Sequence, residues 1–219
     1  MRILITGTSQ GIGLATAIKF LEHGGTVIGI DTQQPPTQLR DCKNYHHYIA
    51  DVRCRTRLPV VGPIDILINN AGVQDEATNI DVNLMGVVNC CNKYGFHPSI
   101  KSVVNVASVS AHNGAEYPLY TASKGGVVAY TKWLAQELCQ YGATVNSISP
   151  GGVITPMTED IWNDEQKRKA VLDETLLNKW ATAEEIADWI FFLSVINKSM
   201  TAQDIIIDNG ETAKFNFIQ

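Results

Sequence analysis

The fold is decided by the stretch Thr6-Gly7-Thr8-Ser9-Gln10-Gly11-Ile12-Gly13, which lies between a predicted strand and a predicted helix. The apolar run at 2–6 is typical of a buried strand, and residues 11–23 have helical periodicity and end at two glycines. Glycines allow a tight turn and a close approach of the backbone to a pyrophosphate, which the N-terminus of the following helix attracts. The stretch therefore predicts a dinucleotide-binding unit; the alternative is a tight turn without a ligand.

Short apolar runs alternate with helical patterns along the rest of the chain. Such alternation is typical of a parallel sheet that is buried on both faces. We therefore expect one doubly wound α/β domain over residues 1–219, of the Rossmann type, with a mostly seven-stranded parallel sheet. Strands are predicted at 2–6, 26–30, 45–50, 64–68, 102–107, 144–148 and 204–207, and helices at 11–23, 82–94, 120–141 and 182–194.

Two connections are short for a parallel sheet. Twelve residues separate Asp51 from Ile64, and nine separate Gly72 from Val82. A parallel crossover needs at least about 10–12 residues including its helix. We expect shortened crossovers after strands 3 and 4, with the first helix stunted or replaced by an irregular turn.

Composition excludes several classes of protein. The 219 residues include 17 Lys and Arg against 22 Asp and Glu, a net charge of −5, and 45% are apolar. This balance argues against disorder and against nucleic-acid binding, and no apolar run reaches the ~20 residues of a membrane span. The five cysteines are odd in number and lack a Cys-x-x-Cys pair, which indicates reduced thiols in a cytoplasmic protein. The histidines lack metal-ligand spacing, so we expect no metal site.

Asp31 ends the second predicted strand, twenty residues after Gly11. A carboxylate at this position accepts hydrogen bonds from the adenosine ribose hydroxyls and repels a 2′-phosphate. No cation occurs among Gln10 and the three residues 32–34. The pattern therefore favours NAD over NADP, and the alternative for Asp31 is a turn residue at a strand end.

Tyr120 and Lys124 are four residues apart, on one face of a predicted helix. The pKa of free tyrosine is ~10, and a neighbouring ammonium lowers it, which makes tyrosine an acid–base group near neutrality. Ser108 ends a predicted strand and can hydrogen-bond a substrate carbonyl, although it can equally be a strand-end cap, and Ser110 is a rival. Asn83 is a polar amide in an apolar helix, which is costly unless it is bonded, either in a site or to a helix carbonyl.

Together these pieces resemble the classical short-chain dehydrogenase/reductase family. The resemblance runs in order from the first strand to the last and rests on the glycine stretch, Asn69-Asn70-Ala71-Gly72, Asn83, Ser108, Tyr120-x-x-x-Lys124 and Pro150-Gly151-x-x-x-Thr155. It implies that Tyr120 is the general acid and base, that Lys124 lowers its pKa and holds the nicotinamide ribose, that Ser108 polarises the carbonyl, and that Asn83 holds a water of a proton relay.

The resemblance also implies a set of cofactor-binding residues. Asp51 and Val52 match the adenine contacts, and Thr155 with the backbone of Val153 would hold the carboxamide. The full expected set is Gly7, Ser9, Gln10, Gly11, Ile12, Gly13, Asp31, Asp51, Val52, Asn70, Ala71, Gly72, Tyr120, Lys124, Pro150, Gly151, Val153 and Thr155.

The function that these residues imply is NAD-dependent interconversion of a secondary alcohol and a ketone by a homo-oligomer, a dimer or a tetramer. The segment from Pro156 to about Leu177 is expected to contact the small-molecule substrate, with Thr158 a plausible helix start. The alternatives are an NADPH-dependent enzyme similar to 3-oxoacyl-carrier-protein reductases and a non-catalytic dinucleotide sensor. One departure from the family pattern is Ala202, where glycine is frequent.

Overall fold

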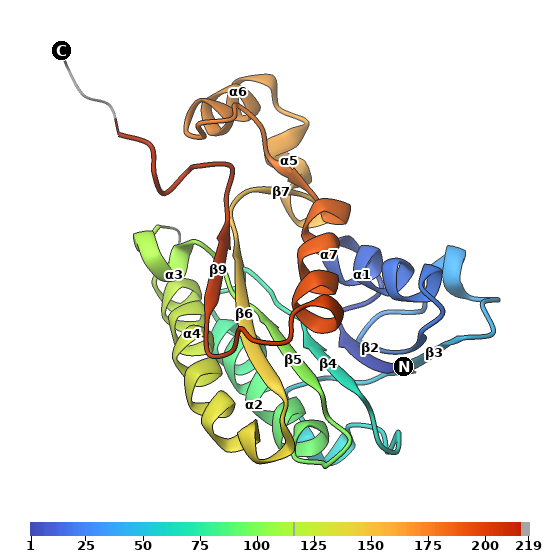
Figure 1. Ribbon diagram of the computed structural model, residues 1–219. Helices are drawn as coiled ribbons and strands as arrows, with labels where there is room; N and C mark the ends of the chain where they lie inside the picture. The colour runs from blue at the N-terminus through green and yellow to red at the C-terminus, as the bar shows by residue number, and fades with distance from the viewer. Residues whose placement is uncertain (116, 216–219) are drawn as a thin grey trace.

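A computed structural model of the chain describes residues 1–115 and 117–215. Its centre is a seven-stranded sheet in which every neighbouring pair is parallel, in the order β3-β2-β1-β4-β5-β6-β9 (Figure 1). The strands are β1 (Arg2–Thr6), β2 (Thr26–Asp31), β3 (Tyr45–Ile49), β4 (Ile66–Asn69), β5 (Ser102–Val106), β6 (Thr144–Pro150) and β9 (Asp204–Ile207), with a separate short pair β7 (Val153–Ile154) and β8 (Ala181–Thr182). The single Rossmann-like α/β domain expected from the sequence is confirmed.

Helices cover both faces of this sheet (Figure 1). The α-helices are α1 (Gly11–Glu22), α2 (Gly86–Cys90), α3 (Ser110–Asn113), α4 (Pro118–Leu138), α5 (Glu159–Trp162), α6 (Glu165–Asp173) and α7 (Ala183–Phe191). Three π-helical turns adjoin them: η3 (Ile80–Met85), η4 (Cys91–Gly95) and η7 (Phe192–Ile196). No helix in the described part of the chain is long and apolar enough to cross a membrane.

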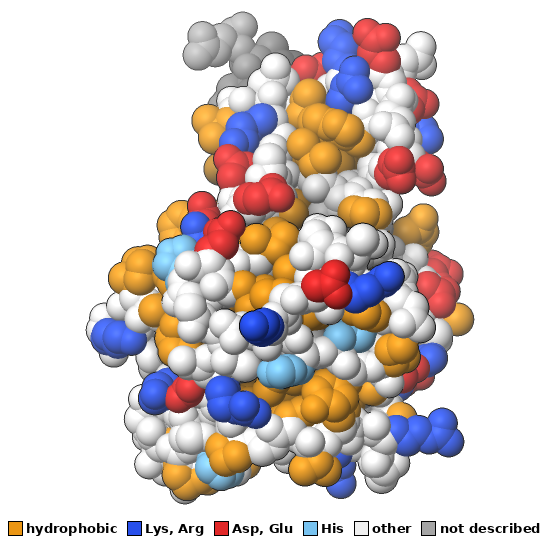
Figure 2. Space-filling view, turned by 90° about the vertical axis from the view of Figure 1, so that its right-hand side faces the viewer, with side chains coloured by type: hydrophobic (Ala, Val, Ile, Leu, Met, Phe, Trp, Pro, Cys, Tyr) orange, Lys and Arg blue, Asp and Glu red, His pale blue; other side chains and the backbone are white. Residues whose placement is uncertain are grey.

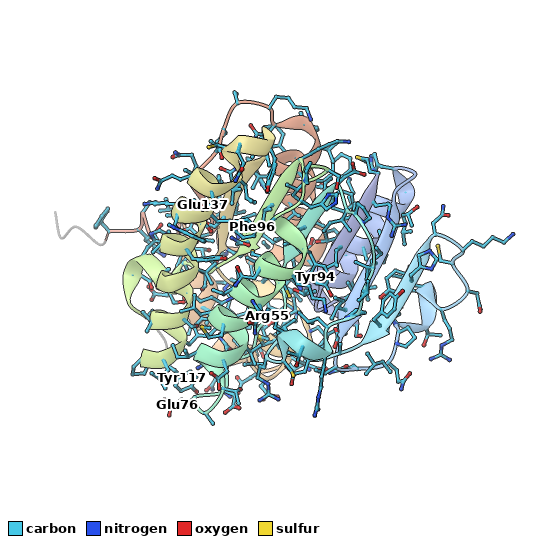
Figure 3. All side chains as sticks on the ribbon, turned by 90° about the horizontal axis from the view of Figure 1, so that it is seen from below. Arg55, Glu76, Tyr94, Phe96, Tyr117 and Glu137 are labelled. Atoms are coloured by element: carbon cyan, nitrogen blue, oxygen red, sulfur yellow. The ribbon has the colours of Figure 1, made fainter. Side chains whose placement is uncertain are left out.

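Two apolar cores lie on the two sides of the sheet. Alternate strand residues face opposite sides, so Leu4 belongs to one core, while Ile3 and Ile5 belong to the other. Helices α2 and α4 cover the first core, and Leu134 of α4 is fully buried there. Helices α1 and α7 cover the second, where Phe20 is fully buried. Figure 3 shows α2 and α4 next to each other on one side of the sheet. Burial of both faces explains why the strands read as continuous apolar runs.

Local signals set several boundaries. The sequence Thr182-Ala183-Glu184-Glu185 has the capping-box pattern that opens a helix, and the box is present at the start of α7: Thr182 Oγ1 accepts from the Glu185 N–H at 3.2 Å, and Glu185 Oε2 accepts from the Thr182 N–H at 2.9 Å. Strand β5 ends at Val106, so Ser108 lies two residues beyond the strand rather than within it. Helices α3 and α6 and the β7–β8 pair were not predicted. The N-cap of α6 is Asp164, whose carboxylate accepts two backbone N–H groups, a signal that the sequence did contain.

The short crossover after β3 contains only the 3₁₀ turn η2 (Arg55–Arg57), as expected. This turn stands where a crossover helix would otherwise lie, and side chains of α2 and η4 fix its position. Asn89 Nδ2 donates to the carbonyls of Val52 and Arg53 at 3.0 and 3.1 Å, and Tyr94 Oη donates to that of Pro59 at 2.8 Å. Three carbonyls of this irregular segment are therefore satisfied by side chains of α2 and η4, as a buried backbone requires.

Ala202 yields a prediction about stability, because its φ of +60° lies in the left-handed region. This conformation costs an L-residue ~1–2 kcal/mol, which exceeds the ~0.4–1 kcal/mol that glycine loses through unfolded-state entropy. We expect Ala202→Gly to raise the free energy of unfolding by up to about 1 kcal/mol, or roughly 2–4 °C in Tm. Ala129→Gly, at an exposed position of α4, is the matched control and should destabilise. A lower Tm for Ala202→Gly would contradict the strain.

Candidate active site

The candidate site lies at the carboxyl ends of the strands, where β1 and β4 are neighbours and the connections leave in opposite directions. Open α/β sheets bind ligands at such a switch point. Asn70 joins the two strand ends, since its Nδ2 donates to the carbonyls of Thr6 and Gly7 at 3.0 and 3.1 Å. In return, Thr6 Oγ1 accepts the N–H groups of Asn70 and Ala71, both at 3.0 Å. These four bonds fix the glycine stretch against the loop after β4.

The glycine stretch leaves no room for side chains at two positions. Gly7 has a φ of +74°, and a Cβ there would lie 2.8 Å from Asn70 Nδ2. A Cβ on Gly13 would lie 1.9 Å from the carbonyl oxygen of Gly7, so the first turn of α1 packs directly on the loop. Gly11 faces Thr155 across the cleft, and a Cβ added at Gly11 would lie 3.4 Å from Thr155 Cγ2. This narrow backbone cradle at a helix N-terminus fits a dinucleotide pyrophosphate.

Both oxygens of Asp31 accept backbone hydrogen bonds. Oδ2 accepts from the Ser9 N–H and Oδ1 from the Gln33 N–H, both at 2.9 Å. A carboxylate oxygen has two lone pairs, so each retains one acceptor position for a ribose hydroxyl. This carboxylate is therefore oriented by the glycine stretch before any ligand binds.

Asp51, one of the predicted adenine contacts, forms an ion pair that was not predicted from the sequence. Its carboxylate accepts from Arg53 Nη2 at 2.6 Å and from Arg53 Nε at 2.9 Å, and this guanidinium lowers the pKa of Asp51 below its ordinary value. Arg53 also lines the cleft, directly after Val52. The available signal was an arginine next to two predicted adenine contacts.

Tyr120 and Lys124 lie together on the side of α4 that faces the cleft, and both are buried. Lys124 Nζ is 5.6 Å from the centroid of the Tyr120 ring and donates to the Val106 carbonyl at 3.0 Å. That carbonyl ends β5, so the sheet itself holds the ammonium beside the phenol. A fixed positive charge at this place favours the phenolate.

Ser108 and Ser110 share one hydrogen-bonded turn rather than one strand face. Ser108 Oγ accepts the hydroxyl of Ser110 at 2.9 Å and its backbone N–H at 3.2 Å. A hydroxyl has one proton and two lone pairs, so these bonds leave the Ser108 proton to be donated to another acceptor. Ser108 lines the cleft, whereas Ser110 is fully buried behind it and positions it.

Asn83 lies behind the cleft in the π-helical turn η3. Its Oδ1 accepts from the Val73 N–H at 2.8 Å, and its Nδ2 donates to the Val73 carbonyl at 2.9 Å and to Ser123 Oγ at 3.2 Å. A Cβ on Gly72 would lie 3.3 Å from Asn83 Oδ1 and 3.5 Å from Lys124 Nζ. The side chain of Asn83 therefore holds the Val73 loop beside Lys124, and π-helical turns are frequent at functional sites.

One cleft of about 830 Å³ brings most of the expected residues together. Ser9, Gly13 and Asn83 are not among the residues that line it. The expected residues that line it are Gly7, Gln10, Gly11, Ile12, Asp31, Asp51, Val52, Asn70, Ala71, Gly72, Ser108, Tyr120, Lys124, Pro150, Gly151, Val153 and Thr155. Among the described residues, no cluster of three or more His, Cys, Asp or Glu has a metal-binding arrangement.

The segment with α5 and α6 forms a lobe above the carboxyl ends of the strands (Figure 1), and in Figure 2 charged side chains of both signs surround an apolar patch on it. Met157, Ile161 and Val171 line the cleft from this segment. Trp180 is buried against Gly152 and stacks on Trp162, with 6.0 Å between ring centroids. Trp180 therefore both packs against its neighbours and lines the cleft.

Comparison with known proteins agrees with this site. Residues 7–212 match the family model described as enoyl-(acyl carrier protein) reductase. The chain is 33% identical to the 3-oxoacyl-[acyl-carrier-protein] reductase FabG of Thermotoga maritima, over 94% of this chain and 96% of the relative. It is 30% identical to L-xylulose reductase of Mus musculus, over 95% of both. A putative 2-deoxy-D-gluconate 3-dehydrogenase of Agrobacterium tumefaciens with bound NADP superposes with a TM-score of 0.89, at 28% identity over 97% of this chain and 96% of that one.

These matches extend over nearly the whole chain, and with the site they establish its class. The protein belongs to the short-chain dehydrogenase/reductase family of oxidoreductases. The resemblance that the sequence motifs indicated is thereby confirmed.

The contact between Gly13 and the Gly7 carbonyl predicts a sharp effect of a single methyl group. Gly13→Ala should lower the free energy of unfolding by about 1–3 kcal/mol and abolish binding of a nicotinamide dinucleotide, because the loop must move away from α1. Gly125→Ala, in α4 with open space around the added methyl, should stabilise by roughly 0.5–1 kcal/mol. Thermal denaturation and fluorescence titration with NADH measure both effects. Normal NADH binding by Gly13→Ala would contradict the cradle.

Proposed function

We propose that the protein interconverts a secondary alcohol and a ketone with NAD(H), with Tyr120 as the acid–base group. The observation that carries this proposal is the buried pair of Tyr120 and Lys124 beside Ser108, in the same cleft as the glycine cradle. The residues present fit a nicotinamide dinucleotide, because a backbone cradle lies at one place in the cleft and acid–base side chains lie at another. When bound, that cofactor donates or accepts the hydride.

In this proposal, side chains of the protein itself transfer the proton. For carbonyl reduction, the Tyr120 hydroxyl donates its proton to the carbonyl oxygen, and for alcohol oxidation the phenolate removes the hydroxyl proton. Lys124 lowers the pKa of Tyr120 from the ~10 of free tyrosine and so makes both directions accessible. Ser108 donates its hydroxyl proton to the same substrate oxygen, a role for which the bonds from Ser110 prepare it. Asn83 holds the loop at Gly72 and Val73 next to Lys124.

The preference for NAD over NADP rests on Asp31. Its carboxylate is fixed at the end of β2 by two backbone N–H groups, where a ribose hydroxyl would be accepted and a 2′-phosphate repelled. Arg53, the cation that lines this end of the cleft, is paired with Asp51.

A second candidate is NADPH-dependent reduction of a 3-oxoacyl thioester. The relative from Thermotoga maritima carries that name at 33% identity, and the solved structure of the Agrobacterium tumefaciens relative contains NADP. The catalytic residues would act in the same way in both reactions. Cofactor preference and a substrate screen separate the two.

We further propose a homotetramer in the cytoplasm. Large apolar side chains are exposed on two sides of the molecule: Met85 and Trp133 on η3 and α4, and Trp189 and Ile196 on α7 and η7. Two such surfaces suit two different symmetric interfaces, as a tetramer with two-fold axes needs. All five cysteines are free thiols, which agrees with a reducing compartment. Light scattering on the purified chain measures its mass, and a monomer would contradict the assembly.

Replacement of Tyr120 tests the reaction. Tyr120→Phe removes only the hydroxyl, so kcat in a panel of secondary alcohols and ketones should fall roughly 10²- to 10⁴-fold, while NADH still binds. Circular dichroism and NADH titration check that the variant is folded. Equal activity of the variant and the wild type would contradict the mechanism.

Replacement of Asp31 tests the cofactor. The wild type should bind NADH more tightly than NADPH, and Asp31→Ser should weaken NADH and strengthen NADPH binding because the repelling charge is removed. Fluorescence titration with each dinucleotide measures both dissociation constants. Tighter binding of NADPH to the wild type would overturn the NAD preference and favour the second candidate.

A further inference from the structure

A chain of hydrogen bonds runs from the glycine stretch to the loop after β2 through two side chains of β3. Thr8 Oγ1 is 2.8 Å from Tyr45 Oη, and Tyr45 Oη is 2.8 Å from His47 Nδ1. His47 Nε2 is 2.9 Å from the carbonyl oxygen of Gln33. Thr8 is fully buried and Tyr45 nearly so, whereas the side chain of Gln33 is exposed. A buried polar chain therefore reaches a surface loop and holds it by its backbone.

The donor and acceptor of each hydrogen bond in this series follow from its last acceptor, the Gln33 carbonyl. The Gln33 carbonyl can only accept, so His47 Nε2 carries a proton. In the neutral imidazole, Nδ1 then accepts the Tyr45 hydroxyl, and Tyr45 Oη accepts the hydroxyl of Thr8. Burial raises the pKa of Tyr45, which keeps its hydroxyl a donor. Every member of the chain has a partner, the condition under which a buried polar network stiffens a structure.

Two further bonds turn the chain into a closed ring. The Gln33 N–H donates to Asp31 Oδ1, and the Ser9 N–H donates to Asp31 Oδ2. Ser9 adjoins Thr8, where the chain begins. Ser9 Oγ also donates to the Gln34 carbonyl at 3.0 Å. The predicted ribose-binding carboxylate of Asp31 is therefore held from both sides within a ring that includes the glycine stretch.

Gly29 of β2 makes room for this ring. A Cβ at Gly29 would lie 2.4 Å from Tyr45 Oη and 2.5 Å from Thr8 Oγ1. Gly29 is the register partner of His47 on β3. The space that a side chain at Gly29 would fill is occupied by the hydroxyls of Tyr45 and Thr8. The ring and this glycine are therefore parts of one arrangement, because any larger residue would displace the buried hydroxyls.

We propose that Tyr45 and His47 are positioning residues for dinucleotide specificity, since they hold the Gln33 peptide and through it Asp31 at a fixed distance from the glycine stretch. Because the ring keeps the pocket from widening, the Asp31 carboxylate stays in the position that the 2′-phosphate of NADPH would occupy. This inference rests on the proposed preference for NAD(H). It assigns a role to two residues that lie outside the expected cofactor contacts.

Binding titrations with purified variants test the proposal. Tyr45→Phe and His47→Leu should raise the dissociation constant of NADH roughly tenfold, about the worth of one net hydrogen bond. The dissociation constant of NADPH should change less, so the ratio of the NADPH and NADH dissociation constants should become smaller. His47→Gln keeps an amide acceptor and donor and should restore most of the discrimination. The value of kcat at saturating NADH should stay within about twofold, because the ring lies apart from Tyr120.

Tyr48→Phe is the matched control, an identical change on the same strand. Tyr48 lies three residues after Tyr45 and so on the opposite face of the strand; it is exposed, and among the described residues no side-chain hydrogen bond is found for it. The control should bind both dinucleotides as the wild type does. Thermal denaturation confirms that Tyr45→Phe, which keeps the buried ring, is folded.

The outcomes separate this proposal from the one on which it rests. A wild type that prefers NADPH contradicts the NAD proposal, and the ring is then tested by whether Tyr45→Phe still changes the ratio of the two dissociation constants. An unchanged ratio in both Tyr45→Phe and His47→Leu overturns the positioning role. Equal weakening of NADH and NADPH overturns it too, because it indicates a general loss of structure.

Discussion

The bonds between Asn70 and the end of β1 are the constraint on which the rest of the site depends. Parallel neighbours β1 and β4 send their connections to opposite faces of the sheet, so their carboxyl ends diverge and open a crevice. Four hydrogen bonds cross that opening: Asn70 and Ala71 donate all of them, and Thr6 and Gly7 accept them. They fix Gly7 in its left-handed conformation, and Gly7 in turn receives Gly13 of α1. The direction in which the α1 N-terminus points is thus set by one amide side chain.

The proposed catalytic side chains follow the same rule, because backbone groups hold each of them. Lys124 is tied to the Val106 carbonyl, Asn83 to both polar groups of Val73, and Ser108 to the N–H of Ser110. Burial of such groups costs free energy unless they are bonded. Here the strand ends and loops provide the partners, so the groups are oriented before a substrate arrives, and little reorganisation remains for the reaction.

Sequence reasoning succeeded where the signal is local. The glycine stretch, the Thr182 capping box and the Tyr120–Lys124 spacing depend on residues a few positions apart. It failed where partners are distant in sequence and meet only in the folded sheet. The ring through Tyr45 requires the register of β3 on β2, which the apolar pattern of neither strand specifies. Ser108 was placed at a strand end by counting, but its orientation comes from a helical turn at Ser110.

The short crossover after β3 determines what supports the predicted adenine end of the cleft. A full helix would satisfy its own backbone, whereas the segment with η2 takes hydrogen bonds from Asn89 and Tyr94. Asn89 bonds the carbonyl of Val52, one of the cleft residues. Helix α2, which carries Asn89, continues directly from the π-helical turn with Asn83. The predicted adenine end and the loop beside Lys124 are therefore braced by one continuous helical segment, so the two ends of the cleft share a support.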